Sequence, residues 1–321
     1  MLSLIVPIFK NEENLPRLLA ELMKLDKALE GEMEVVFVID GSPDRSEEVL
    51  RSRLAQLALR TQLISLSRNF GSFSAIAAGL VCGSGTYFAC IAADLQEPPD
   101  LVLEFSRLLK SGAADIVFGA RVTRSDPWLS RIASGLFWSA YRRFVNKDIP
   151  PNGIDVFGCS QQVREELMNL REVNTNLVAL LLWLGYRRTF VPYQRQPRLE
   201  GQSAWTLSKK LRYAFDSVFN FTDLPLRMLL GLGVAGVTIS VAAGTVVLLA
   251  RLLRHVEVPG YTPIVLAICF FGGLTALGLG IIGQYLWLSL QNTRGRPNFV
   301  IASRQSFGLD SQNTIKKGPE Y

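Results

Sequence analysis

The sequence predicts an α/β protein in which a mostly parallel sheet is followed by two membrane-crossing helices. Over residues 1–120, short apolar runs alternate with segments of helical spacing, as in consecutive β-α-β units. Three of the apolar runs end in polar turns that carry an acid. Two long uncharged stretches follow near the C-terminus, and each exceeds the roughly 20 residues that a membrane crossing needs.

The elements of the sheet follow from local patterns. Residues 1–9 form an apolar run that predicts the first strand, and leucines at helical spacing over residues 15–29 predict an amphipathic helix. A helix is expected after Pro43, because proline suits the first turn and Glu47 and Glu48 follow it. The remaining expected strands are residues 34–39, 63–66, 87–93, 115–118 and 187–191, and the remaining expected helices are residues 72–80 and 177–184. Residues 152–157 are expected to form a loop and a strand that place Asp155 near the strand ends.

Glu12, Asp40 and Asp94 each follow a predicted strand. The carboxyl ends of parallel strands meet at one edge of a sheet, where ligands bind in such folds. Asp94 and Gln96 carry oxygen donors that suit Mg²⁺ or Mn²⁺, ions that usually keep several waters and bind substrate phosphates. A lone Asp-x-Gln is more often an ordinary surface turn, but three acidic turns at one edge favour a ligand site.

Composition limits the possible partners and chemistries. Hydrophobic residues make up 49% of the 321 residues and the mean hydropathy is +0.22, which favours contact with lipid. The net charge of +6 suits phosphate ligands or an anionic membrane, whereas no zinc-finger spacing is present and we expect no nucleic-acid partner. His255 is the only histidine, which excludes a histidine base. The cysteines lack a CxxC pair and are expected to be reduced and buried: Cys82, Cys90, Cys159 and Cys269.

Basic and aromatic segments flank the predicted membrane region. Residues 128–145 and 205–221 combine aromatic residues with arginine or lysine, and the first suits a membrane interface and an ordinary core-facing helix equally well. Residues 193–210 are basic and contain Gly201, which suits a loop that binds phosphate. The alternative is that these charged residues simply form a solvated surface.

The expected membrane helices are residues 228–250 and 262–290. Their many small residues favour tight helix pairing and a homo-oligomer. Lysines and arginines outside this hairpin outnumber those in its turn, which predicts a multi-pass inner (plasma) membrane protein with both termini cytoplasmic. The expected divisions are a catalytic domain (1–200), a basic loop with an interfacial helix (201–225), the hairpin (226–291) and a partly disordered tail (292–321).

Six motifs in order resemble one family. They are Val6-Pro7-Ile8-Phe9, Asp40-Gly41-Ser42 with Asp44, Ser67-Arg68-Asn69-Phe70-Gly71, Ala93-Asp94-Leu95-Gln96-Glu97-Pro98-Pro99, Gly119-Ala120-Arg121, and Arg195-Gln196-Pro197-Arg198 with Gly201 and Ser203. Together with the hairpin, they resemble the membrane-anchored inverting glycosyltransferases of family 2, especially the bactoprenol glucosyltransferases and, more distantly, the dolichyl-phosphate mannose synthases. The resemblance extends from residue 1 to about residue 300.

The resemblance implies a GT-A fold that transfers a hexose from a nucleotide sugar, with UDP-glucose favoured over a GDP-mannose-type donor, to undecaprenyl or another polyprenyl phosphate. It implies Mg²⁺ or Mn²⁺ as cofactor. By matching positions, nucleotide contacts are implied for Pro7, Phe9, Glu12 (or Asn11), Asp40 and Arg68; metal contacts for Asp94 and Gln96; lipid-phosphate or diphosphate contacts for Arg195, Arg198 and Ser203; and catalytic roles for Asp155, Asp94 and Arg121.

Two positions depart from the family pattern. Ala92 and Ile39 stand where many members carry an additional aspartate. The loss at Ala92 is the one argument for a non-catalytic membrane scaffold, and Asp94, Gln96, Asp155 and the arginines oppose that alternative. A processive polysaccharide synthase is disfavoured because the Gln-x-x-Arg-Trp signature is absent.

Overall fold

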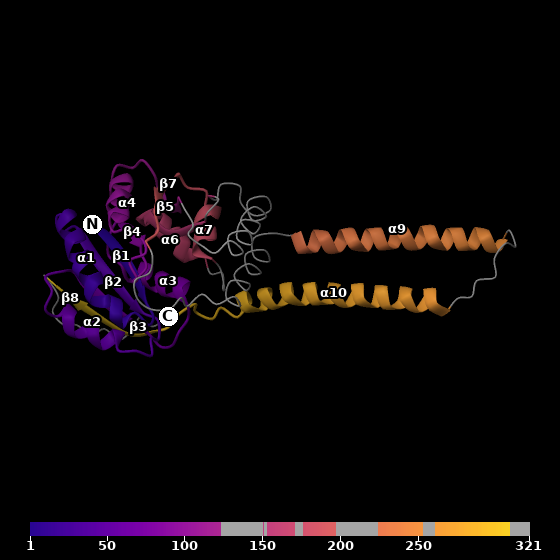
Figure 1. Cartoon of the computed structure of the whole chain (residues 1–321), viewed down its shortest axis with the longest axis horizontal. Helices are drawn as coiled ribbons and strands as arrows, with labels where there is room; N and C mark the ends of the chain where they lie inside the picture. The colour runs from indigo at the N-terminus through magenta and orange to yellow at the C-terminus, as the bar shows by residue number, and fades with distance from the viewer. Residues whose placement is uncertain (123–149, 151–152, 171–175, 197–223, 253–260, 309–321) are drawn as a thin grey trace. The chain divides into compact units, whose positions relative to one another are not determined.

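The computed structural model describes residues 1–122, 150, 153–170, 176–196, 224–252 and 261–308 (Figure 1). The chain divides into two compact units. The first comprises Met1–Lys210 together with Pro297–Tyr321, and the second comprises Leu211–Arg296. The expected amphipathic segments at residues 128–145 and 205–221 lie outside the described residues, as do Arg198 and Ser203.

Within the described part of the first unit, the strands form one sheet in the order β7-β5-β6-β4-β1-β2-β3-β8. Neighbouring strands are parallel from β4 through β1 and β2 to β3, and β5 is parallel to β7. Only β6 and β8 run antiparallel to their neighbours in this sheet. The predicted α/β class with a mostly parallel sheet is therefore confirmed. The bounds are β1 Leu2–Ile8, β2 Met33–Ile39, β3 Thr61–Leu66, β4 Tyr87–Cys90, β5 Ile116–Arg121, β6 Ile154–Ser160, β7 Arg188–Tyr193 and β8 Ile301–Phe307.

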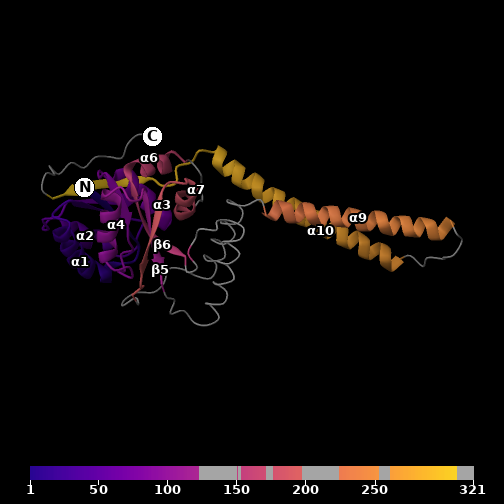
Figure 2. The same ribbon diagram turned by 90° about the horizontal axis from the view of Figure 1, so that it is seen from above.

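The helices of this unit form two groups on the sheet (Figures 1 and 2). Helix α1 (Leu15–Ala28) contacts α2 (Ser46–Leu54) and α4 (Asp100–Lys110), and α6 (Gln161–Asn169) contacts α3 (Ser72–Cys82) and α7 (Leu177–Trp183). A short 3-10 helix, η1 (Glu12–Asn14), precedes α1. The leucine spacing correctly predicts the core-facing side of α1, whose buried residues are Leu15, Leu18, Leu19, Leu22 and Leu25.

The strand before the acidic turn is shorter than the apolar run predicts. The sequence predicts a strand to Ala93, but β4 ends at Cys90. The chain then turns, and Leu95 adopts a left-handed conformation (φ 52°) that non-glycine residues seldom occupy. Leu95 is nevertheless 6% exposed, so its buried side chain helps to hold the turn.

The C-terminal segment contains a strand that the sequence does not predict. Residues 292–321 are expected to form a polar, partly disordered tail, whereas Ile301–Phe307 pair with β3 as β8. Arg304 donates from Nε to Gln62 Oε1 (3.0 Å) and from Nη2 to the Cys82 carbonyl (3.1 Å). These bonds explain how a polar segment joins the sheet.

The hydrogen bonds of Gln62 continue to a buried carboxylate. Glu34, which is 5% exposed, accepts from Gln62 Nε2 (3.2 Å), from the Ser84 hydroxyl (2.9 Å) and backbone amide, and from the Ser3 hydroxyl. A buried carboxylate is tolerated when donors surround it, as they do here. The network joins β8 to β1, β2, β3 and the end of α3.

The second unit contains two long helices, α9 (Leu224–Leu252) and α10 (Tyr261–Thr293). They approach each other at glycines: Gly236 lies beside Phe271, and Gly278 lies beside Leu229. Among the described residues, one helical stretch, Phe270–Thr293, is long and apolar enough to cross a membrane. The two helices expected in the hairpin are therefore present, whereas a second membrane span is not confirmed.

Candidate active site

The candidate site lies at one edge of the sheet. The carboxyl ends of β1, β2, β4, β5 and β7 share this edge, and β6 begins there because it runs antiparallel to β4 and β5. Strand β5 ends with Arg121, Asp155 is near the start of β6, and Tyr193 ends β7. Turns after β2 and β4 carry Asp40 and Asp94. The prediction that acidic turns meet at one edge is confirmed for these parallel strands.

Asp155 and Arg121 form the main ion pair of the site. Arg121 donates from Nε to Asp155 Oδ2 and from Nη2 to Oδ1. This bidentate arrangement fixes the orientation of the guanidinium relative to the carboxylate. The hydroxyl of Tyr193 donates to the same Oδ2 at 2.6 Å. The side chains of Arg121 and Asp155 are 14% and 24% exposed, so the pair is partly shielded from solvent. Asp155 thus holds the guanidinium of Arg121 at the sheet edge.

The turn after β4 contacts the chain just beyond β7. Arg195 donates from its guanidinium to Gln96 Oε1, and the backbone amide of Gln196 donates to the Gln96 carbonyl (2.8 Å). Within the turn, the Gln96 amide donates to Asp94 Oδ1 (3.3 Å). The structure therefore brings together Asp94, Gln96 and Arg195, which the resemblance associates with metal and phosphates.

Glu97 is the buried acid between these two groups. It is 2% exposed, and its Oε2 accepts from the Ala92 amide (3.3 Å). Burial first, and then the nearby charges of Asp155 and Asp94, raise the pKa of Glu97 to about 7, against a smaller lowering by Arg195 and the Ala92 amide. Glu97 therefore supports the backbone of the turn through its bond from the Ala92 amide.

The raised pKa of Glu97 predicts a pH-dependent stability. The folded state binds this proton more tightly than the unfolded chain, whose pKa is near 4.5. The stabilisation is complete below pH 4.5 and is lost as pH rises to about 7, by roughly 3 kcal/mol if no cation binds. Glu97→Gln should remove this loss, as measured by denaturant unfolding of the full chain with a chelator present.

Glu104 provides the control for this prediction. It lies half-exposed on α4 and pairs with Arg107, which lowers its pKa below 4.5. Glu104→Gln should therefore leave the slope between pH 4.5 and 7 unchanged. An equal slope in wild type and Glu97→Gln would mean that Glu97 does not titrate in this range.

The carboxylate of Asp40 binds the loop after β3. Its oxygens accept from the amides of Phe70 (2.7 Å) and Gly71 (2.9 Å), and burial raises its pKa despite these bonds. The adjacent Gly41 has φ +56°, and a Cβ there would lie 2.4 Å from the backbone of Arg68. Glycine is thus required for the turn to approach the loop. Asp40 is 3% exposed and mainly positions residues 68–71, where Arg68 stacks on Phe70 (4.2 Å).

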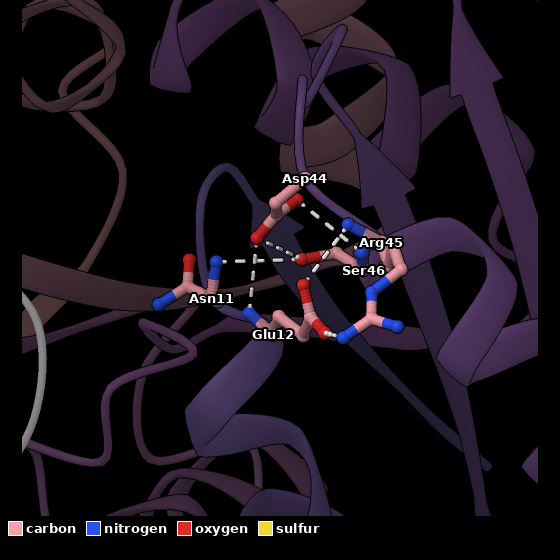
Figure 3. A network of polar contacts seen from close by, with 5 residues as sticks. All are labelled: Asn11, Glu12, Asp44, Arg45 and Ser46. Atoms are coloured by element: carbon pink, nitrogen blue, oxygen red, sulfur yellow. Dashed lines mark hydrogen bonds and ion pairs between the residues drawn. The ribbon is translucent and has the colours of Figure 1, made fainter.

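A second polar network joins the turns after β1 and β2 (Figure 3). Glu12 pairs with the Arg45 side chain (2.8 Å) and accepts from its amide (3.1 Å), while the Glu12 amide donates to Asp44 Oδ2 (3.1 Å). Asp44 also accepts from the Ser46 hydroxyl (2.8 Å), and the Asn11 amide donates to that hydroxyl (3.4 Å). Glu12 is therefore held in a turn-to-turn contact, and its expected nucleotide contact stays a prediction.

The remaining expected nucleotide residues lie at the end of β1. Pro7 pairs in register with Val38 of β2, and Phe9 follows the strand, where the Lys10 ammonium lies 5.6 Å from its ring. Sequence reasoning missed Tyr193 as a partner of Asp155. Its place two positions after a predicted strand (residues 187–191) and two positions before Arg195 was the available signal.

Comparison with known proteins identifies the family. Residues 3–168 match the sequence pattern of the family described as "Glycosyl transferase family 2". The chain belongs to glycosyl transferase family 2. A Synechocystis protein named as an uncharacterized glycosyltransferase is 33% identical over 302 residues, which cover 94% of each chain. The bactoprenol glucosyl transferase of Shigella phage SfX is 30% identical over 305 residues, covering 95% of this chain and 99% of that one.

Solved structures of lower similarity also match this glycosyltransferase. Glucosyl-3-phosphoglycerate synthase of Mycobacterium tuberculosis, in complex with Mn²⁺, uridine diphosphate and glucosyl-3-phosphoglycerate, aligns with a TM-score of 0.48 and 18% identity, covering 68% of this chain and 77% of that one. A mannosyltransferase of Pyrobaculum calidifontis, with GDP-Man and Mn²⁺, aligns with a TM-score of 0.45 and 14% identity over 89% of this chain and 87% of that one.

Proposed function

We propose that this glycosyltransferase moves a hexose, with inversion, from a nucleotide sugar to a polyprenyl phosphate at the cytoplasmic face of the inner membrane, for cell-envelope glycosylation. The favoured substrates are UDP-glucose and undecaprenyl phosphate. The observation that carries the proposal is the meeting of Arg121 and Arg195 with Asp94, Gln96 and Asp155 at one sheet edge. Similarity over nearly the whole chain to proteins named bactoprenol glucosyl transferases supports the choice of acceptor.

The proposed reaction needs alignment more than a strong base. An oxygen of the lipid phosphate attacks the anomeric carbon from the face opposite the nucleotide, and the bond from that carbon to the diphosphate oxygen breaks. A phosphate acceptor is already anionic near neutral pH, so no proton has to be removed. Two anionic substrates must instead be held close together, and Arg121 and Arg195 provide positive charge for this purpose. Asp155 orients Arg121 through its paired oxygens.

Asp94 and Gln96 are proposed to hold Mg²⁺ or Mn²⁺. Their carboxylate and carboxamide oxygens are the hard donors that these ions prefer. The described residues contain no group of three or more His, Cys, Asp or Glu side chains that could hold an ion, so phosphates and water would supply the remaining ligands. When bound, such an ion supplies Lewis-acid stabilisation of the departing diphosphate.

Both α9 and α10 are proposed to cross the membrane as a hairpin, with the catalytic residues and both termini in the cytoplasm. Large apolar side chains are exposed on both helices, including Leu230 (69%), Ile239 (68%), Ile268 (66%) and Leu286 (65%). Exposed apolar side chains along both helices favour contact with lipid. Gly231, Gly233, Gly272 and Gly280 meet no neighbour within 4 Å at their Cβ positions, which is compatible with the proposed homo-oligomer.

A transfer assay tests the proposed function. The purified full chain is incubated with polyprenyl phosphate, Mg²⁺ and radiolabelled UDP-glucose, and organic-soluble label is counted; GDP-mannose and other nucleotide sugars are tested in parallel. We expect labelled lipid with UDP-glucose. If only GDP-mannose gave labelled lipid, the proposed reaction would stand and the proposed donor would change. No labelled lipid with any donor would favour the non-catalytic scaffold.

Asp94→Ala is expected to reduce metal-dependent transfer by at least about a hundredfold, because the turn loses its carboxylate ligand. Membrane insertion should be unaffected, and Mn²⁺ binding measured by electron paramagnetic resonance should weaken. Asp100→Ala is the matched control, because Asp100 is an exposed acid at the start of the next helix. A wild-type rate in Asp94→Ala would place the cation elsewhere.

A further inference from the structure

Tyr193, Arg121 and Asp155 come from three adjacent strands of the sheet. In the pairing of β5 with β7, Arg121 lies opposite Tyr193, and in the pairing of β5 with β6, Ala120 lies opposite Ile154. The three side chains therefore form a row across the sheet edge. Hydrogen bonds join the row: Arg121 to both oxygens of Asp155, and the Tyr193 hydroxyl to Oδ2.

The phenol of Tyr193 is a buried donor. The residue is 5% exposed, and burial, followed by the charge of Asp155, raises its pKa above the ordinary value of 10. The hydroxyl therefore keeps its proton at neutral pH and donates to the carboxylate. A buried hydroxyl that donates to a charged oxygen contributes more than a neutral hydrogen bond, and it restricts how that carboxylate can rotate.

The backbone around Tyr193 holds the ring in place. A Cβ at Gly119 would lie 3.2 Å from Cε1 of the Tyr193 ring and 2.7 Å from Val156 Cγ2, so the absence of a side chain on β5 makes room for the ring. The Val122 amide donates to the Tyr193 carbonyl (3.0 Å), and the Gln196 amide, just beyond, donates to Gln96 (2.8 Å). Tyr193 is thus fixed by contacts on both sides.

We propose that Tyr193 is a positioning residue for the transfer reaction: its hydroxyl holds the carboxylate of Asp155 against Arg121, so that the guanidinium faces the phosphates in one orientation. The inference rests on the proposed function, since it concerns the geometry of the same reaction. Tyr193 acts through Asp155 and makes no contact with the sugar or the nucleotide in this scheme. The small residue at Gly119 is part of the same arrangement.

Kinetics of Tyr193→Phe test the proposal. Loss of one hydrogen bond to a charged oxygen is expected to lower kcat by about tenfold, while KM for the nucleotide sugar changes by less than about twofold. Tyr186→Phe, in the turn before β7, is the matched control and should leave both constants unchanged. A wild-type kcat in Tyr193→Phe, or a loss confined to KM, would overturn the positioning role.

A spectroscopic measurement tests the contact without activity. 3-Fluorotyrosine is placed at position 193 of the full chain, and its fluorine resonance is recorded in detergent. Asp155→Asn should move the resonance, whereas Asp115→Asn should not, although Asp115 forms a similar pair with Arg187 before the same strands. An unmoved resonance in Asp155→Asn would overturn the proposal. A wild-type chain without transferase activity would contradict the proposed function, and this measurement would still decide the contact.

Discussion

Asp155→Ala is expected to lower kcat by about a thousandfold, the upper range for loss of a single electrostatic element of an active site. The substitution leaves Arg121, with a side chain only 14% exposed, without its carboxylate, and it removes the acceptor of the Tyr193 hydroxyl. Without that carboxylate the guanidinium can rotate away from the orientation in which it faces the phosphates. The loss should be measured as kcat in the lipid-transfer assay at saturating donor.

The stability of the same variant separates a local effect from unfolding. Removing one member of a partly buried ion pair should cost roughly 2 kcal/mol, below the value for a fully buried pair because Asp155 is 24% exposed. Asp115→Ala is the control for activity, since it breaks an Arg–Asp pair in which the Asp side chain is equally exposed (24%) but lies before β5, away from the candidate site, and it should leave kcat unchanged. Full activity in Asp155→Ala would show that Arg121 needs no carboxylate to act.

Glu34→Ala is expected to be the most destabilising single substitution considered for the first unit. It removes an acceptor shared by the Ser3 hydroxyl and Gln62 Nε2, which are buried in the sheet, and by both donors of Ser84, which is exposed in the turn after α3. Donors left buried without acceptors each cost about 1–3 kcal/mol, and partial rearrangement limits the total to roughly 4 kcal/mol. The melting temperature should fall by roughly 10 °C.

Glu32→Ala is the matched control for this effect. Glu32 precedes β2 by one position and pairs with Lys110, but its side chain is 59% exposed. Its removal should change the melting temperature little. Similar melting temperatures for wild type and Glu34→Ala would mean that water or other groups replace the carboxylate.

Local patterns predicted most of the sheet and the edge at which the candidate site lies. The leucines of residues 15–29 and the apolar runs ending near Glu12, Asp40 and Asp94 depend on short-range spacing, which a single sequence displays directly. Strand β8 could not be found in this way. It contains the charged residue Arg304, whose hydrogen-bond partners Gln62 and Cys82 are distant in the chain. The hydrogen bonds that offset the cost of partly burying Arg304 are therefore visible only in the fold.

The site was predictable by residue type but not by partner. Asp155, Arg121, Gln96 and Arg195 were expected from their motifs, whereas nothing in the spacing indicates that Arg121 pairs with Asp155 or that Arg195 contacts Gln96. The burial of Glu97 and Tyr193 could not be predicted for the same reason, because each is covered by elements from other parts of the chain. Tertiary contacts decide which of several polar groups at an edge become neighbours.

Strand β8 changes how this protein can be divided. Because the chain returns to the first unit at Pro297 after leaving it at Lys210, the helical hairpin is an insertion within the glycosyltransferase domain rather than a C-terminal appendage. Truncation before α9 would uncover the edge of β3 and promote aggregation. A water-soluble catalytic fragment therefore requires an internal excision, with a flexible linker joining the residues before the hairpin to β8.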